Sequence, residues 1–255
     1  DNTYSNVNTI GMLAAIGIII QADEIVRNRK FSVEAVLAIP SLIMVIATQS
    51  RKALLMLIIG VLLVLIFRNL KNKKFFQNVL KIVAILIVVA FLLRYFSTME
   101  IFEGINTRMM YLFAMFTGEG EVGASAMLRQ QLIDLGINIF RQNPLVGIGI
   151  GCPHIIADQQ LHFDAYLHNG FVEMLAAGGL VGFCIYYGSY IYLLWNFYRN
   201  RKGKDENYVL CIVLSLILLF RDYAMVAVYD KSMYFYFMIL FLEVKNLKMK
   251  KENFV

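Results

Sequence analysis

The chain has 255 residues, of which 59% are hydrophobic and only 16% are charged, and its mean hydropathy is +0.64. A soluble domain carries about 25% charged residues and about 45–50% apolar ones, so this composition excludes an ordinary soluble globular protein. The formal net charge of +6 would suggest nucleic-acid binding in a soluble protein. Here the basic residues gather at the ends of apolar blocks, so a membrane-orientation signal explains them better and no nucleic-acid partner is expected.

Seven apolar blocks follow one another along the chain, separated by basic or polar stretches. This pattern predicts an all-α, polytopic transmembrane helical bundle in contact with membrane lipid, with about seven spans. The blocks are Thr9–Val26, Val33–Thr48, Ala53–Phe67, Val79–Phe96, Gly170–Trp195, Tyr208–Phe220 and Met233–Val244.

Four clusters of lysine and arginine follow the first, third, fifth and seventh blocks, at residues 27–30, 68–74, 199–204 and 245–251. All four therefore fall on one side of the membrane, and such an excess predicts that this side is the cytoplasm. The predicted organisation has four spans in residues 1–96, then an extracytoplasmic loop with active-site elements in residues 97–169. Three further spans and a basic cytoplasmic tail occupy residues 170–255.

The second half of the long loop predicts one amphipathic helix, from about Ser125 to Gln142. Asn143-Pro144 should end this helix, because the residue before a proline is disfavoured in the helical conformation. Such a helix would lie on, or dip into, the outer face of the membrane. Its apolar stripe at helical spacing consists of Leu132, Ile133, Gly136, Ile137 and Phe140.

Arg129 extends that stripe by one turn towards the N-terminus. An arginine on the apolar face of an interfacial helix either extends its charged end to water or binds an anion in a shielded crevice. Periodicity alone favours the first interpretation and leaves the second open.

His168 stands just before the apolar block that begins at Gly170, and Asn169 between them is suited to cap that helix. The N-terminus of a helix favours an anion such as phosphate, although position alone favours a structural histidine bonded to a loop carbonyl. Glu173, one turn into the same helix, could face a cavity or partner, or simply interact with the helix dipole.

Several other residues are candidates for ligand binding. Gly147, Gly149 and Gly151 are not preceded by a strand, so they indicate flexible backbone near a ligand, or a tight turn, rather than a nucleotide site. Arg51 lies in a basic cluster on the outer side, where it could bind an anion or anchor the interface. Arg221 and its neighbour Asp222 could form an ion pair or belong to the site.

These residues together resemble the O-antigen ligase/polymerase family of polytopic bacterial enzymes. The specific part of the resemblance is the stretch from Asn143 to Gly182, with Leu128-Arg129 before it, and the Ser50-Arg51 turn and the Asn6-Val-Asn8 stretch resemble two further family motifs. Family members have about twelve spans with both ends in the cytoplasm. This resemblance, together with a first residue Asp1 and no signal-peptide pattern, leads us to expect the later part of a longer protein.

The resemblance implies roles for individual residues. Arg51 and Arg129 would hold the diphosphate of an undecaprenyl-diphosphate-linked oligosaccharide donor. His168 would serve as the base or orienting group for the acceptor hydroxyl, and Asn169, Glu173 and Arg221 would be secondary. The family implies inverting transfer without a metal ion or other cofactor. None of the three cysteines pairs with another at metal-site spacing.

The function expected from the resemblance is polymerisation of O-antigen or capsular repeat units at the extracytoplasmic face of the bacterial inner membrane. The acceptor would then be a lipid-linked repeat, and a chain-length regulator and a flippase are expected partners. The alternative within the family is a ligase, which transfers the finished glycan to a lipid A core or to protein. A polysaccharide or lipid transporter and a non-catalytic assembly protein are alternatives from other classes. Against a transporter, the polar residues gather at the outer face and the sequence shows no paired broken helices.

Overall fold

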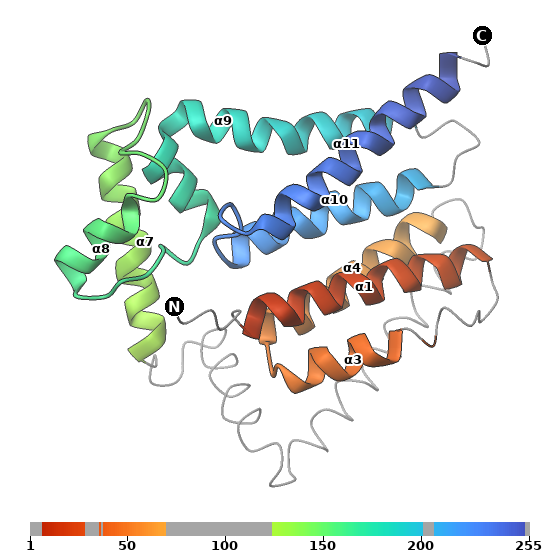
Figure 1. Ribbon diagram of the computed structural model, residues 1–255, viewed down its shortest axis with the longest axis horizontal. Coiled ribbons are helices and arrows are strands. Elements are labelled where there is room, and N and C mark those ends of the chain that lie inside the picture. Colours follow the sequence, from red (N-terminus) through yellow and green to blue (C-terminus); the bar gives the residue numbers. More distant parts are fainter. Residues whose placement is uncertain (1–6, 29–35, 37, 70–123, 201–206, 253–255) are drawn as a thin grey trace, which may run out of the picture. The chain divides into compact units, whose positions relative to one another are not determined.

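The computed structural model describes residues 7–28, 36, 38–69, 124–200 and 207–252 (Figure 1). Within these residues every regular element is a helix and no strand is present, which confirms the all-α prediction. The helices are α1 (Val7–Asn28), α3 (Ala38–Ala47), α4 (Arg51–Asn69), α7 (Ala124–Gln142), α8 (Pro153–Leu161), α9 (Gly170–Arg199), α10 (Asn207–Ala224) and α11 (Lys231–Glu252).

Six of the seven apolar blocks coincide with helices, and the block at residues 79–96 lies outside the described residues. In the part of the chain that the structure describes, three helices are long and apolar enough to cross a membrane, namely Val7–Arg27, Gly170–Arg199 and Asn207–Ala224. α3 is apolar but has only 10 residues, while α11 is long but carries Glu243, Lys245 and Lys248. The described residues therefore indicate a membrane protein, and a count of seven spans stays a prediction.

Helix α10 packs against α1, α9 and α11, and α1 packs against α3 (Figure 1). The face that α1 buries has the helical period and is apolar as far as the buried Asp23, with Met12, Ala15, Ile16 and Ile19 fully buried. Gly60 of α4 allows a close approach, because a methyl group there would fall on the side chain of Ile19.

The polar ends of these helices meet in two groups. At one end, Ser50 Oγ donates to Asn8 Oδ1 (2.7 Å), and the Lys52 ammonium donates to the carbonyl oxygen of Ala224. At the other end, Arg27 donates to Asn207 Oδ1 (3.0 Å). The first group contains residues predicted to be extracytoplasmic, and the second contains residues predicted to be cytoplasmic.

Helix α9 is interrupted at Gly179, whose φ of 60° and ψ of −161° lie in a region open essentially only to glycine. The backbone groups freed by the interruption pair with the segment Pro144–Gly149, which follows α7. Four hydrogen bonds form this pairing: Ile148 N to Ala176 O (3.0 Å), Gly149 N to Ala177 O (2.8 Å), Leu180 N to Pro144 O (2.8 Å) and Val181 N to Leu145 O (3.1 Å). Such pairing is required wherever lipid replaces water around a helix, because unpaired backbone groups are costly there.

Replacing Gly179 with alanine should destabilise the protein by about 2–5 kcal/mol. The added methyl group would fall on the carbonyl of Leu145, in a backbone conformation that strains any L residue. Gly188→Ala is the matched control, because a methyl group at that position of α9 meets no atom of the described residues within 4 Å. Thermal unfolding of both purified proteins in detergent is the measurement, and equal stability would contradict this role of the interruption.

Candidate functional site

His168 occupies the turn immediately before α9, and its backbone is held in an unusual conformation. Its φ is 57°, a left-handed value that is uncommon for residues other than glycine. The neighbouring Asn169 caps α9, as predicted, since its Oδ1 accepts from the backbone N–H groups of Phe171 (3.0 Å) and Val172 (3.2 Å). The left-handed turn and the cap together fix where the imidazole stands.

Glu173 is fully buried one turn into α9 and holds the residues before His168 in place. Its Oε2 accepts a hydrogen bond from the backbone N–H of Leu167 (2.9 Å), and its Oε1 accepts one from the hydroxyl of Tyr229 (2.9 Å). Of the two interpretations left open by the sequence, the structure supports the one in which this carboxylate has specific partners. It acts on the candidate site by positioning His168.

Tyr229, between α10 and α11, was not singled out by the sequence. Its hydroxyl accepts from the backbone N–H of Gly151 (3.0 Å) while donating to Glu173, and its ring lies 4.8 Å from that of Tyr166. It therefore joins the α10–α11 connection to the glycine-containing segment and to the start of α9. No local motif signals this role, because its partners are 56 and 78 residues away in the chain.

The glycines at 147, 149 and 151 all have positive φ values, of 65°, 110° and 80°. A methyl group at Gly147 would fall on the backbone of Ala176 and Ala177, so this glycine allows the segment to lie against the interrupted part of α9. The backbone at Gly147 thus lies against a helix of the same chain, and its approach to a ligand stays a prediction.

Arg129 lies exposed on α7, which forms as predicted and ends at Gln142 before Asn143-Pro144. The face that α7 buries consists of Leu132, Leu135, Gly136 and Ile139, so it is rotated from the predicted stripe, and Ile133, Ile137 and Phe140 are half-buried. A methyl group at Gly136 would fall on Leu167 and Val172, which flank His168 and its cap. This close approach brings α7 against the start of α9.

Two positive charges act on His168. Partial burial lowers the pKa of the imidazole from its ordinary value, and the charges of Arg129 and Lys52 lower this pKa further. Burial, and then the charge of Arg129, also lowers the pKa of Lys52 to about 8. Cationic side chains from α4 and α7 thus lie near the imidazole at the N-terminus of α9.

Lys52 lies next to Arg51, the cation that the sequence favours for anion binding. Arg51 is half-buried as the first residue of α4, and the turn before it is fixed by Ser50, whose Oγ also accepts from the backbone N–H of Ala53 (3.3 Å). Both residues belong to the outer basic cluster that the sequence marked. Which of them acts on the imidazole depends on helix packing, so the sequence alone could not select Lys52.

Arg221 and Asp222 are both fully buried, but they do not form an ion pair with each other. Arg221 pairs with Asp230 and donates to Ser232 Oγ (3.1 Å). Asp222 accepts from the hydroxyl of Tyr187 (2.7 Å) and from the backbone N–H of Ala227 (3.3 Å). Both side chains therefore shape the α10–α11 connection, which carries Tyr229.

Replacing Tyr229 with phenylalanine should destabilise the protein by about 1–3 kcal/mol, because it leaves the Gly151 N–H and the buried Glu173 carboxylate each without one partner. Tyr223→Phe is the control, since the exposed Tyr223 hydroxyl makes no hydrogen bond within the described part of the chain. Thermal unfolding distinguishes the two, and a Tyr229→Phe protein as stable as the control would show that the bridge contributes nothing.

The family model described as O-antigen ligase matches residues 36–187, which include Arg51, Arg129, His168 and Glu173. No curated protein matches the chain. Because the family match spans more than half of the sequence, the chain belongs to the O-antigen ligase family.

Proposed function

We propose that this protein is a membrane glycosyltransferase that moves an undecaprenyl-diphosphate-linked oligosaccharide onto an acceptor sugar at the extracytoplasmic face of the bacterial inner membrane, and so polymerises repeat units. The observation that carries the proposal is the packing around the start of α9, which meets α7 at Gly136 and α10 at Asp222, two residues before the Ala224 carbonyl that Lys52 binds. The charges of Arg129 and Lys52 both lower the pKa of His168 at this place. Membership of the O-antigen ligase family supports the same class of reaction.

The charges of the candidate site suit a diphosphate leaving group. Negative charge develops on that group as the glycosidic bond breaks, and fixed cations placed beside it stabilise the transition state. Arg129 and Lys52 supply two positive charges near His168, and Arg51 begins the same helix as Lys52. The N-terminus of α9 adds the positive end of a helix dipole. In this proposal these groups replace the charge that a metal ion would provide.

In the proposed reaction, His168 acts as the general base. The acceptor hydroxyl oxygen attacks the anomeric carbon of the donor, and the bond from that carbon to the diphosphate oxygen breaks. The hydroxyl proton passes to the imidazole, and the diphosphate leaves on its carrier lipid with the bonding electron pair. Attack from the side opposite the leaving group inverts the anomeric configuration. A lowered pKa keeps the imidazole neutral, and therefore able to accept this proton, at neutral pH.

The grouping of the helix ends supports the proposed membrane face. Asn8, Ser50 and Lys52 lie at the same helix ends as Ala224, whereas Arg27 lies with Asn207 at the other. In the sequence, the basic cluster at residues 27–30 includes Arg27 and the cluster at residues 199–204 precedes Asn207, as expected for cytoplasmic ends. The candidate site belongs to the first group, which places it outside the cytoplasm in this proposal.

A ligase is the second candidate within the family, and the description of the matching family favours it. In a ligase the acceptor would be a lipid A core or a protein instead of a lipid-linked repeat. The proposed chemistry at His168 is the same in both cases, so the identity of the acceptor decides between them.

The sequence shows no broken helix, but the structure has one, at Gly179 in α9. Broken helices in transporters present unpaired backbone groups to a substrate near the middle of the membrane. In this chain the groups freed at Gly179 are instead hydrogen-bonded to the segment Pro144–Gly149. The interruption therefore serves to hold that segment, and it supports no transport site.

Replacing His168 or Arg129 with alanine should reduce glycan transfer by about 10²–10³-fold, because each change removes a group that acts in the transition state. The measurement is the length profile of surface glycan on a gel, in a strain that lacks the complete gene and carries wild type or one variant. A polymerase predicts that the ladder of long chains collapses to a single repeat in both variants.

His162→Ala is the matched control for His168→Ala, because His162 is an exposed histidine that also has a left-handed backbone conformation, with φ of 52°. Its ladder should match wild type. Long chains that persist but stay on the carrier lipid would identify a ligase. A normal ladder from His168→Ala and Arg129→Ala, at normal protein levels, would refute the catalytic assignment.

The pH dependence of transfer should respond to the charge of Lys52. Activity that needs a neutral His168 is lost as the pH falls through the pKa of the imidazole, which in the wild type lies below its ordinary value. Lys52→Met removes one positive charge that lowers this pKa, so the acidic limb of the rate profile should move to higher pH. The rate of transfer by purified protein, measured across pH, tests this. If the acidic limb of the Lys52→Met profile stays at the wild-type pH, the charge of Lys52 does not act on the pKa of the catalytic base.

A further inference from the structure

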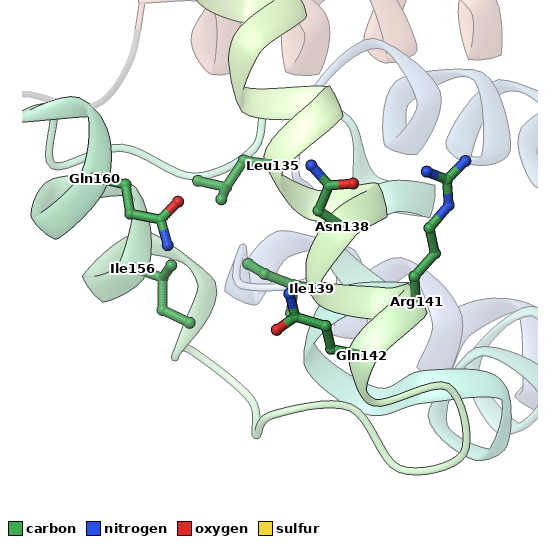
Figure 2. Close-up of a pocket in the computed structure, with 7 residues that line it drawn as sticks. All are labelled: Leu135, Asn138, Ile139, Arg141, Gln142, Ile156 and Gln160. Atoms are coloured by element: carbon green, nitrogen blue, oxygen red, sulfur yellow. The ribbon is translucent and has the colours of Figure 1, made fainter.

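A pocket of about 300 Å³ lies between α7 and α8, and none of the candidate catalytic residues lines it (Figure 2). Its lining from α7 includes Leu135, Asn138, Ile139 and Gln142, whose spacing places them on one helix face. Its lining from α8 is Ile156 and Gln160, one turn apart. The pocket therefore forms where two helix faces meet.

Both ends of α8 are defined by local sequence features. Pro153 begins the helix, where a missing N–H costs nothing, and this proline is buried together with Ala157. His162 ends the helix in a left-handed conformation, and its N–H donates to the carbonyl of Asp158 (3.0 Å). Gln160 follows Pro153 by seven residues and Ala157 by three, so it lies at the edge of that buried face, where its exposed side chain lines the pocket with Ile156.

The chemistry of the pocket suits an uncharged ligand that is rich in hydroxyl groups. Leu135, Ile139 and Ile156 form an apolar surface, and the amides of Asn138, Gln142 and Gln160 surround it (Figure 2). Each amide offers both a donor and an acceptor, as a sugar hydroxyl requires. Within the described residues none of these three amides hydrogen-bonds to another protein group, so their capacity is available to a ligand.

A phosphate would need cations, and the pocket does not present one between its two helices. Arg141 contributes to the lining, but Figure 2 shows its guanidinium projecting away from α8 and from the other side chains. The pocket thus differs in chemistry from the site at His168, where two cations gather.

We propose that the pocket between α7 and α8 is a subsite for the glycan part of a substrate, at a distance from the sugars that react. Asn138 and Gln142 follow Arg129 by 9 and 13 residues on the same helix, which is about 14–20 Å along its axis. A glycan whose reacting end lies beside Arg129 and His168 would reach the pocket with a sugar further along its chain. This inference rests on the proposed glycosyltransferase function.

Binding is tested without turnover, using the complete protein with His168→Ala in lipid nanodiscs. The probe is the oligosaccharide repeat released from the carrier lipid by mild acid, and the measurement is its dissociation constant by calorimetry. Adding Asn138→Ala or Gln160→Ala should weaken binding by about fivefold each, which corresponds to one hydrogen bond of about 1 kcal/mol. Gln159→Ala, an exposed amide next to Gln160 that does not line the pocket, should leave the constant unchanged.

Steady-state kinetics of pocket variants that retain His168 show whether the donor or the acceptor places its glycan in the pocket. If Gln160→Ala raises the KM for the donor chain alone, the donor occupies the pocket, and a raised KM for the acceptor alone identifies the acceptor. Equal dissociation constants for Gln160→Ala, Asn138→Ala and Gln159→Ala, or no binding of the repeat at all, would overturn the subsite.

The proposed function can fail separately from the subsite. Suppose that the wild-type protein transfers no glycan, but that its His168→Ala form binds the repeat and Gln160→Ala weakens this binding. That outcome would refute the proposed glycosyltransferase activity and support the glycan-binding pocket. A wild-type protein that transfers glycan normally, with no effect of either pocket variant on binding or on KM, would refute the subsite alone.

Discussion

The pairing of backbone groups between the interruption in α9 and the segment Pro144–Gly149 is the interaction on which the candidate site depends. The chain between α7 and α9 is attached to α9 at two points, by this pairing at one end and by the Asn169 cap at the other. Within that closed loop, α8 and the turn of His168 have little freedom. The same attachment holds α7 beside the start of α9, where Arg129 can act on the imidazole.

Buried polar side chains next to this loop stabilise the candidate site through hydrogen bonds and an ion pair. Glu173 and Arg221 would each be costly inside an apolar bundle without partners, and each has them. The two networks converge on the connection between α10 and α11, because Tyr229 binds Glu173 while the adjacent Asp230 binds Arg221. Glu173 and Arg221 thus have protein partners, and the proposed substrate contacts are assigned to Arg129 and Lys52, the two cations whose charges act on His168.

Features that depend on nearby residues were predicted well from the sequence. The helix at Ala124–Gln142 ends before a proline, and the Asn169 cap acts on amides two and three residues away, so both follow from local chemistry. The apolar blocks coincide with helices wherever the structure describes them, because a run of apolar residues buries its own backbone polar groups best as a helix. The family resemblance rested on short motifs, and the matching family model agrees with it.

The sequence by itself determined the helical class, the end of α7 before Asn143-Pro144 and the cap of α9 by Asn169. Only the tertiary structure decided how the residues near the candidate site are used: Arg221 binds Asp230 instead of Asp222, Glu173 positions the His168 turn, and Lys52 acts on the imidazole. In the sequence, Gly179 is one of several small residues in an apolar block. Only the structure shows that the segment Pro144–Gly149 lies against it. The reason is physical, since a cap or a helical period is set within a few residues, whereas the partner of a buried charge is set by how distant helices pack.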